Sequence, residues 1–237
     1  MNRDEINDAA FFGLGVPRQW SVSSKSPFYE DWMSGHFAQY DPAAANALLD
    51  EMGLIMGPNG IRLRPDGQEL RIVLSDAINR VQVLKLVAEY WTDVGVATQV
   101  NSLTREAFQQ GVLAWTVQAS VWCADVVSEK DMFTRPIWFR PPYGLDTNPL
   151  GGGAAWRQWE LTNGAEGTEP PTEFKAQQDL VARWQSTPLE TTEYYALGKE
   201  VVGNTVRMML HLGTVGEVPY IYARSNRLYS ESFGSRI

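Results

Sequence analysis

Between residues 70 and 122 the sequence alternates strand-like and helix-like segments, and this order restricts the folds open to the chain. In ELRIVLS, Leu70, Ile72 and Leu74 recur at every second position, which predicts a strand buried mainly on one face. A helical pattern follows and ends at Gly95. ATQVNSL and LAWTVQASVW predict two further strands, and between them Thr104 is expected to cap a short helix that runs through Phe108. This order is typical of an α/β layer with parallel strands joined by right-handed crossovers.

Helices are also predicted before and after this layer in the sequence. In YDPAAANALLDEMG, Asp41 suits the helix N-cap and Pro42 suits the first helical position. The apolar face predicted for this helix consists of Ala45, Leu48, Leu49 and Met52. Two longer helices are predicted over residues 172–185 and 189–210, and EVPYIYA predicts a closing strand. No repeat or linker divides the chain, so we expect residues 1–237 to form a single domain.

The segment 126–171 differs from the rest because it is dense in proline and glycine and too irregular for a long helix or strand. A loop of this length is usually functional or disordered, and its many aromatic residues argue against disorder. The whole chain contains nine tryptophans. Most of them are expected in the core, and the others are expected to line a recess where their flat faces stack on a ligand.

Charge and composition argue against several classes of partner. The formal net charge is −8 and the basic residues are not clustered, which argues against nucleic-acid binding. No stretch approaches the ~18 consecutive apolar residues of a transmembrane helix. The first residues, MNRDEINDAAFF, carry charges where a secretory signal has its apolar region. Cys123 is the single cysteine, and we expect a buried, unreactive thiol.

The motifs of catalysis and of metal binding are missing from the sequence. His36 and His211 have no other His or Cys at ligand spacing, so no metal site and no cofactor are predicted. The sequence has no G-x-S-x-G motif, and its glycine-rich stretches lack the remaining residues of nucleotide-binding loops. Asp125, Glu129 and Asp131 form an acidic group, but acids at a strand end are usually solvated. No catalytic residue is therefore predicted.

Asp125 is the strongest candidate for a ligand-binding residue. It lies just past the carboxyl end of the third predicted strand, where open α/β sheets bind their ligands. Its carboxylate could accept hydrogen bonds from an ammonium group or from sugar hydroxyls. The neighbouring Trp122 could supply a stacking or cation–π surface. The alternative is an aspartate that turns the chain through bonds to its own backbone, and the residues alone favour neither.

Several segments in order resemble the family 5 extracellular solute-binding proteins, which include oligopeptide and dipeptide receptors of ABC importers. They are MNRDEIN…FFGLGVP, YDPAAANALLDEMGL, RPDGQELRIVL, VAEYWTDVGVATQV, WCADV and VPYIYA. The pattern YDP-x-x-A-x-x-LLDE-x-G is the most specific of them. The resemblance implies a periplasmic-binding-protein-like (type II) lobe of the α/β class, with a mixed, mostly parallel sheet flanked by helices and a long aromatic-rich loop.

The resemblance also implies an organisation and a function. Family members have two lobes, and the matching segments belong to the second, so the sequence is expected to be a C-terminal fragment. Residues from about 212 to 237 would return toward the missing first lobe, and the export signal would lie on the missing part. The expected function is capture of an oligopeptide or oligosaccharide-like solute between two lobes, in the periplasm or outside the cell, for delivery to the membrane subunits of an ABC permease. The chain is not expected to be an enzyme.

In the family's oligopeptide receptors a W-C-A-D stretch presents its aspartate to the α-ammonium group of the peptide, which implies this role for Asp125 beside Trp122. The flanking residues differ from that pattern, and RPIWFRPP with the tryptophans after it resembles a branch that includes oligosaccharide receptors. We expect ligand contacts from Asp125, Trp122, Trp138, Trp156 and Trp159. Two other functions stay open: a small cytosolic enzyme acting on a sugar or acidic substrate with Asp125 as acid or base, and an interaction module that exposes the aromatic loop.

Overall fold

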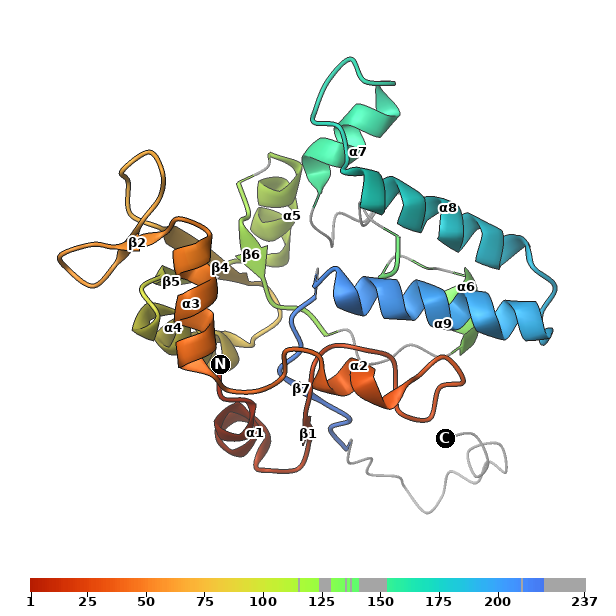
Figure 1. Ribbon diagram of the computed structural model, residues 1–237, viewed down its shortest axis with the longest axis horizontal. Helices are drawn as coiled ribbons and strands as arrows, with labels where there is room; N and C mark the ends of the chain where they lie inside the picture. Colours follow the sequence, from red (N-terminus) through yellow and green to blue (C-terminus); the bar gives the residue numbers. More distant parts are fainter. Residues whose placement is uncertain are drawn as a thin grey trace.

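The computed structural model describes residues 1–114, 116–123, 129–134, 136, 138–140, 153–209 and 211–219. Its sheet has three parallel strands, with β4 (Arg71–Asp76) between β5 (Ala97–Ser102) and β6 (Ala119–Ser120). The helix α4 (Val81–Asp93) leads from β4 to β5, and α5 (Arg105–Leu113) leads from β5 to β6 (Figure 1). The predicted parallel α/β layer is therefore confirmed.

The third strand is much shorter than predicted. The helix α5 continues to Leu113 instead of ending near Phe108, and only Ala119 and Ser120 pair with β4. One step earlier on β4, the N–H of Val73 donates to the side-chain oxygen of Gln118 at 2.7 Å. A side chain thus takes the place of the backbone carbonyl that would have extended the ladder.

One hydrophobic cluster lies between the sheet and its helices. Ile6 of α1 (Arg3–Phe11), Leu74 of β4, and Val83 and Val87 of α4 are buried in it. The spacing of the two valines on α4 places them on one face of the helix, which explains why this face packs on the sheet.

The helix α3 (Pro42–Glu51) begins as predicted, because the Oδ1 atom of Asp41 accepts the N–H of Ala44 at 2.9 Å. It precedes an antiparallel hairpin of β2 (Ile55–Met56) and β3 (Arg62–Leu63). Arg62 is 1% exposed, and its guanidinium donates to the carboxylate of Asp50 at 2.5 Å and to the carbonyl of Val94 at 2.8 Å. This one buried side chain ties α3, the hairpin and the end of α4 together.

The predicted apolar face of α3 is not buried by any part of the chain that the structure describes. Leu48 is 50% exposed and Met52 is 68% exposed, and no residue of α3 is buried. Polar and backbone bonds to Arg62, rather than an apolar face, therefore attach this helix to the rest of the fold.

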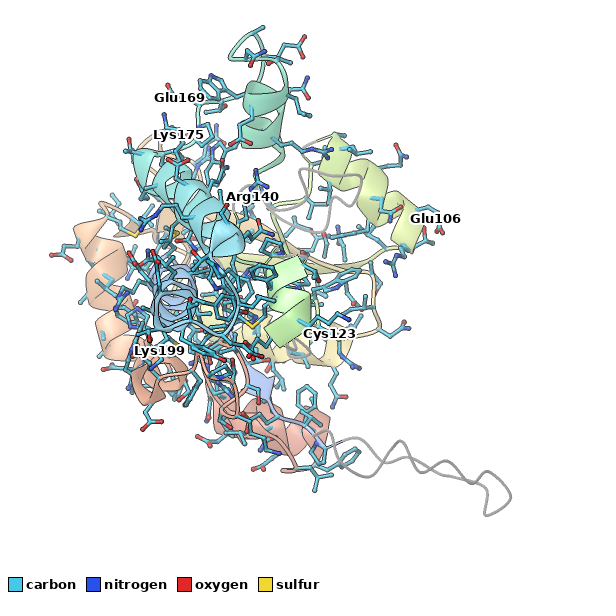
Figure 2. The ribbon with its side chains drawn as sticks, turned by 90° about the vertical axis from the view of Figure 1, so that its right-hand side faces the viewer. Glu106, Cys123, Arg140, Glu169, Lys175 and Lys199 are labelled. Carbon is cyan, nitrogen blue, oxygen red and sulfur yellow. The ribbon has the colours of Figure 1, made fainter. Side chains whose placement is uncertain are left out.

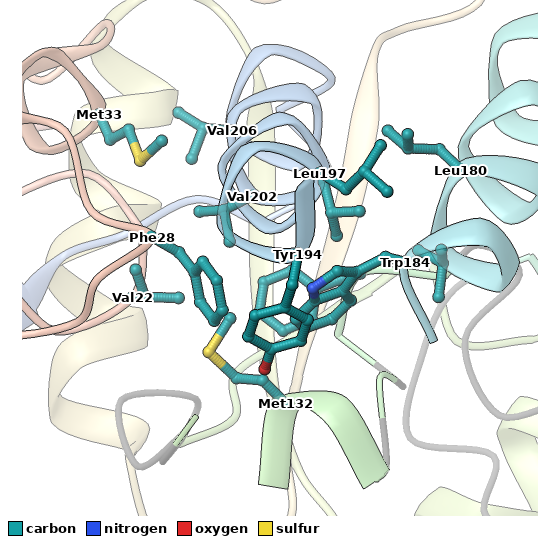
Figure 3. Packing of buried hydrophobic residues seen from close by; sticks show 13 residues of the cluster. Val22, Phe28, Met33, Met132, Leu180, Trp184, Tyr194, Leu197, Val202 and Val206 are labelled. Atoms are coloured by element: carbon teal, nitrogen blue, oxygen red, sulfur yellow. The ribbon is translucent and has the colours of Figure 1, made fainter. Parts of the chain in front are cut away.

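The second half of the chain is built on two helices that lie side by side, α8 (Thr172–Ser186) and α9 (Thr192–Arg207). They confirm the two helices predicted after the loop. Figure 3 shows the second hydrophobic cluster, in which Phe28, Met132, Trp184 and Tyr194 meet. Phe28 precedes the short helix α2 (Asp31–Gly35), so the N-terminal segment contributes to both clusters.

The segment predicted to be irregular contains two helices. They are α6 (Glu129–Thr134), which supplies Met132 to the second cluster, and α7 (Ala154–Leu161). Residues 141–152, at the centre of the segment, lie outside the described residues.

Two segments far apart in the sequence cross between the clusters. β1 (Val16–Pro17) pairs antiparallel with β7 (Val215–Gly216). The predicted closing strand EVPYIYA begins at Glu217, so β7 ends just before it; residues 217–219 are not in a strand, and residues 220–223 lie outside the described part of the chain. No helix of the described residues is long and apolar enough to cross a membrane.

The packing of α9 on Phe28 gives a stability prediction. A Cβ atom at Gly198 would lie 2.3 Å from Cε1 of the fully buried Phe28 ring. We expect Gly198→Ala to lower the free energy of unfolding by about 1–3 kcal/mol in urea titrations, because the added methyl group would overpack the contact with Phe28. Gly203→Ala on the same helix is the matched control, since its nearest neighbour is the flexible end of Arg207 at 3.2 Å. Equal stability of the two variants would contradict the prediction.

Candidate functional site

A cleft of about 780 Å³ lies where the two halves of the chain meet. Its described lining comes from the helices α1, α4 and α5, from Leu74 of β4, and from residues 117–123 around β6. Trp138, the start of α7 and the crossing segments that contain β1 and β7 complete it. Most of these side chains are apolar or aromatic, and five tryptophans are among them: Trp20, Trp91, Trp122, Trp138 and Trp156.

The structure brings together three of the five predicted ligand-binding residues. Trp122, Trp138 and Trp156 all line the cleft. Trp159 is not among the described lining residues, and Asp125 lies outside the described part of the chain. Trp20 and Trp91 also line the cleft, and neither was predicted as a ligand contact.

Trp122 is positioned by α5. Its ring is stacked on Phe108 with centroids 6.0 Å apart, and the guanidinium of Arg105 lies 5.3 Å from its centroid. Both partners come from the helix that precedes β6, so the short strand and α5 together orient the indole.

Cys123 was predicted to be buried, and that prediction is wrong. The thiol, labelled in Figure 2, is exposed. The reason is the early end of β6 at Ser120, because the residues after it leave the sheet for the wall of the cleft.

Trp138 lies in an aromatic corner with Trp20 and His211. The imidazole of His211 is 4.6 Å from the ring of Trp20 and 5.7 Å from the ring of Trp138. Its Nε2 atom lies 3.2 Å from the backbone oxygen of Trp138. Trp20 also contacts the buried Phe139, with ring centroids 5.6 Å apart. The corner thus joins residues from three distant parts of the sequence.

Trp156 and Trp159 lie on α7 but have different surroundings. Trp156 lines the cleft and packs on Phe174, with ring centroids 4.6 Å apart. Trp159 lies under the ammonium group of Lys175 at 5.7 Å and against Gly164. Lys175, labelled in Figure 2, forms an ion pair of 2.6 Å with Glu169. Trp159 therefore fixes the connection between α7 and α8.

The main charged groups of the cleft wall neutralise each other. The buried guanidinium of Arg18 donates to Oε1 of Glu217 at 2.7 Å, and the N–H of Ser24 donates to the same oxygen at 2.9 Å. The bond from Ser24, followed by the charge of Arg18, lowers the pKa of Glu217. Arg80 is also in the lining and is exposed. In the described lining, Glu217 is the one acidic residue.

Burial lowers the pKa of His211 to about 4, against the smaller opposing effect of the Trp138 carbonyl. The imidazole is therefore neutral at neutral pH. A neutral ring with a carbonyl oxygen at Nε2 carries its proton on that nitrogen and donates it.

Asp76, at the carboxyl end of the neighbouring strand β4, illustrates the alternative proposed for Asp125. It is 3% exposed, and its two carboxylate oxygens accept the backbone N–H groups of Ile78 and Arg80 at 2.9 Å each. This side chain turns the chain from β4 into α4 and has no oxygen directed at a ligand. Among the described residues, no group of three or more His, Cys, Asp or Glu could hold a metal ion.

Residues 1–141 match the family of bacterial extracellular solute-binding proteins, family 5, in its middle region. The chain belongs to this family. It is 35% identical over 116 residues to a probable ABC transporter-binding protein of Deinococcus radiodurans, a match that covers 46% of this chain and 18% of that protein.

Solved structures show the same fold. An oligopeptide-binding protein OppA superposes with a TM-score of 0.78 and 31% identity, over 91% of this chain and 35% of that chain. The periplasmic binding protein MelB of Agrobacterium fabrum, in complex with stachyose, superposes with a TM-score of 0.68 and 16% identity, over 91% of this chain and 32% of that chain. The type II periplasmic-binding-protein-like fold is thereby confirmed, and the chain spans about a third of the length of these solved relatives.

The charge state of His211 predicts a pH dependence of stability. Below its ordinary pKa of 6.5 the unfolded chain takes up a proton, whereas the folded chain stays neutral at this residue until about pH 4. Stability is therefore lost as the pH falls through this window, by up to about 3 kcal/mol. Urea unfolding at several pH values should show a steeper loss for the native chain than for His211→Gln. The same pH dependence of the unfolding free energy in the two proteins would contradict the lowered pKa of His211.

Proposed function

We propose that this chain is the solute-capturing lobe of an ABC importer's binding protein, and that the described cleft holds the solute without transforming it. The observation that supports the proposal is the convergence of five tryptophans, from distant parts of the sequence, on one cleft in a member of this family. Indole faces offer a large contact area at little entropic cost, which suits reversible capture.

The lining favours an uncharged, oligosaccharide-like solute. Arg18 and Glu217 compensate each other, so the buried lining described here offers no free charge to the ammonium or carboxylate end of a peptide. Flat aromatic faces suit sugar rings, and relatives of the same fold have been solved with stachyose and with mannohexaose. Asp125 would accept hydroxyl hydrogen bonds beside Trp122. An oligopeptide is the second candidate, because the similarity to OppA reaches 31% identity.

The remaining length of the relatives supports a two-lobe organisation. Residues 1–237 would form one lobe as a single domain, and residues from about 212 to 237 would return toward the other lobe. Closure of the two lobes by a hinge motion would enclose the solute, and the closed form would dock on the permease at the membrane surface, in the periplasm or outside the cell.

The two-lobe organisation predicts a difference between the lone chain and a longer protein. Calorimetric titration of residues 1–237 with mannohexaose, stachyose or a pentapeptide should give weak or undetectable heat, because half of the contacts are missing. A protein that also contains the other lobe should bind one of these solutes at least tenfold more tightly. Tight binding by residues 1–237 alone, or turnover of any of the solutes, would overturn the proposal.

The site predicts which tryptophans matter for binding. In the two-lobe protein, we expect Trp138→Ala and Trp156→Ala each to weaken solute binding by about tenfold or more, which is at least ~1.4 kcal/mol. Trp159→Ala is the matched control on the same helix, and it should leave the dissociation constant within about threefold. A larger effect of Trp159→Ala than of Trp156→Ala would place the solute elsewhere.

A further inference from the structure

His211 connects two cleft tryptophans that are remote in the sequence. Its ring centroid lies 4.6 Å from that of Trp20 and 5.7 Å from that of Trp138, in a T-shaped arrangement with Trp138. Its Nε2 atom lies 3.2 Å from the Trp138 carbonyl oxygen. All three residues line the cleft. The histidine therefore contacts one indole through its ring and the other through both ring and hydrogen bond.

The contact with Trp20 is fixed by the backbone. The side-chain oxygen of Gln19 accepts the N–H of Gly213 at 2.5 Å and the N–H of Trp20 at 2.8 Å. A Cβ atom at Gly213 would lie only 2.0 Å from the backbone nitrogen of Trp20. The segment that carries His211 is thus in direct contact with the segment that carries Trp20, and the two have little freedom to separate.

The Trp138 side is held at two successive carbonyl groups. His211 bonds the carbonyl of Trp138, and the buried amide of Gln177 donates to the carbonyl of Phe139 at 3.0 Å. Phe139 itself is fully buried in the second cluster. Of these two anchors, His211 is the one in the cleft wall and the one attached to Trp20.

We propose that His211 is a positioning residue for solute binding, which fixes the Trp138 backbone relative to Trp20 so that the two indoles form one preorganised wall of the cleft. This inference rests on the proposed function, because it assumes that the wall contacts the solute. The ring of His211 supplies the contact with Trp20, and its N–H supplies the bond to Trp138. Preorganisation of this kind raises affinity by removing the cost of ordering side chains on binding.

The two contacts of His211 can be separated by substitution. His211→Phe keeps a flat ring against Trp20 and removes the donor to Trp138, whereas His211→Gln keeps an N–H donor and removes the ring. Fluorine NMR of the chain labelled with 5-fluorotryptophan reports on each of the nine tryptophans, once single Trp→Phe variants have assigned the signals. We expect the Trp138 signal to shift and broaden in His211→Phe and to stay near its native position in His211→Gln.

A second histidine provides the matched control. His36 lies 5.8 Å from the ring of Trp32, and neither residue lines the cleft. We expect His36→Phe to change the Trp32 signal and to leave the Trp138 signal unchanged. A native Trp138 signal in His211→Phe, or an equal change of that signal in His36→Phe, would overturn the positioning role.

Titration of the same labelled chains with mannohexaose, and separately with pentaalanine, tests whether the wall formed by Trp20 and Trp138 contacts the solute. NMR detects binding in the millimolar range, so it suits the lone chain. We expect His211→Phe to weaken the binding of the active solute about tenfold and His211→Gln to weaken it by less than about threefold. Equal affinity of His211→Phe and the native chain would overturn the inference and leave the proposed function intact. If neither solute moves any signal, either of the native chain or of a labelled protein that also contains the other lobe, the proposed function fails, and the unliganded Trp138 signal decides the anchoring role separately.

Discussion

The close approach of two chain segments, residues 14–24 and 211–219, is the contact on which the rest of the structure depends. At Gly213 a side chain would collide with the backbone of Trp20, and Gly15 has equally little room beside Val215. The pair β1 and β7 and the ion pair of Arg18 with Glu217 hold this crossing. It joins the sheet-based cluster to the helix-based cluster, and the cleft is the space left on one side of it.

Much of the fold could be predicted from local patterns. The strand β4, the helix α4 and the Asp41 cap of α3 each depend on a few neighbouring residues, and each lies where the sequence predicted it. The predicted burial of β4 mainly on one face is wrong, because Leu74, Ser75 and Asp76 are buried in succession. The predicted length of the third strand was wrong for a non-local reason, since the side chain of Gln118 replaces a backbone partner of β4. The predicted apolar face of α3 is exposed for a similar reason, because the distant Arg62 attaches the helix through polar bonds.

The site was predictable only in part, and the limit is sequence distance. Trp122 was predicted because it neighbours Asp125 in the W-C-A-D stretch, and Trp138 and Trp156 because they lie in the segment dense in proline and glycine; all three line the cleft. Trp20 and His211 carried no such signal. His211 and Trp138 are 73 positions apart in the sequence, and His211 and Trp20 lie on the two segments that cross. Only the folded chain brings the three residues together. An isolated histidine in a sequence is therefore weak evidence against a role at a site.

The ion pair of Arg18 with Glu217 explains how an acidic protein can present a cleft wall whose one acidic residue is compensated. The net charge is −8, yet the one acidic residue of the described lining, Glu217, accepts bonds from Arg18 and Ser24. Its backbone has a φ of 51°, a left-handed conformation that is uncommon for a residue with a side chain. The two bonds to its carboxylate offset that conformational cost. Satisfying this charge within the protein leaves Arg80 as the exposed charged side chain of the described lining, and most of the other lining residues are apolar or aromatic. Such a surface supports the proposed choice of ligand by shape and stacking rather than by charge.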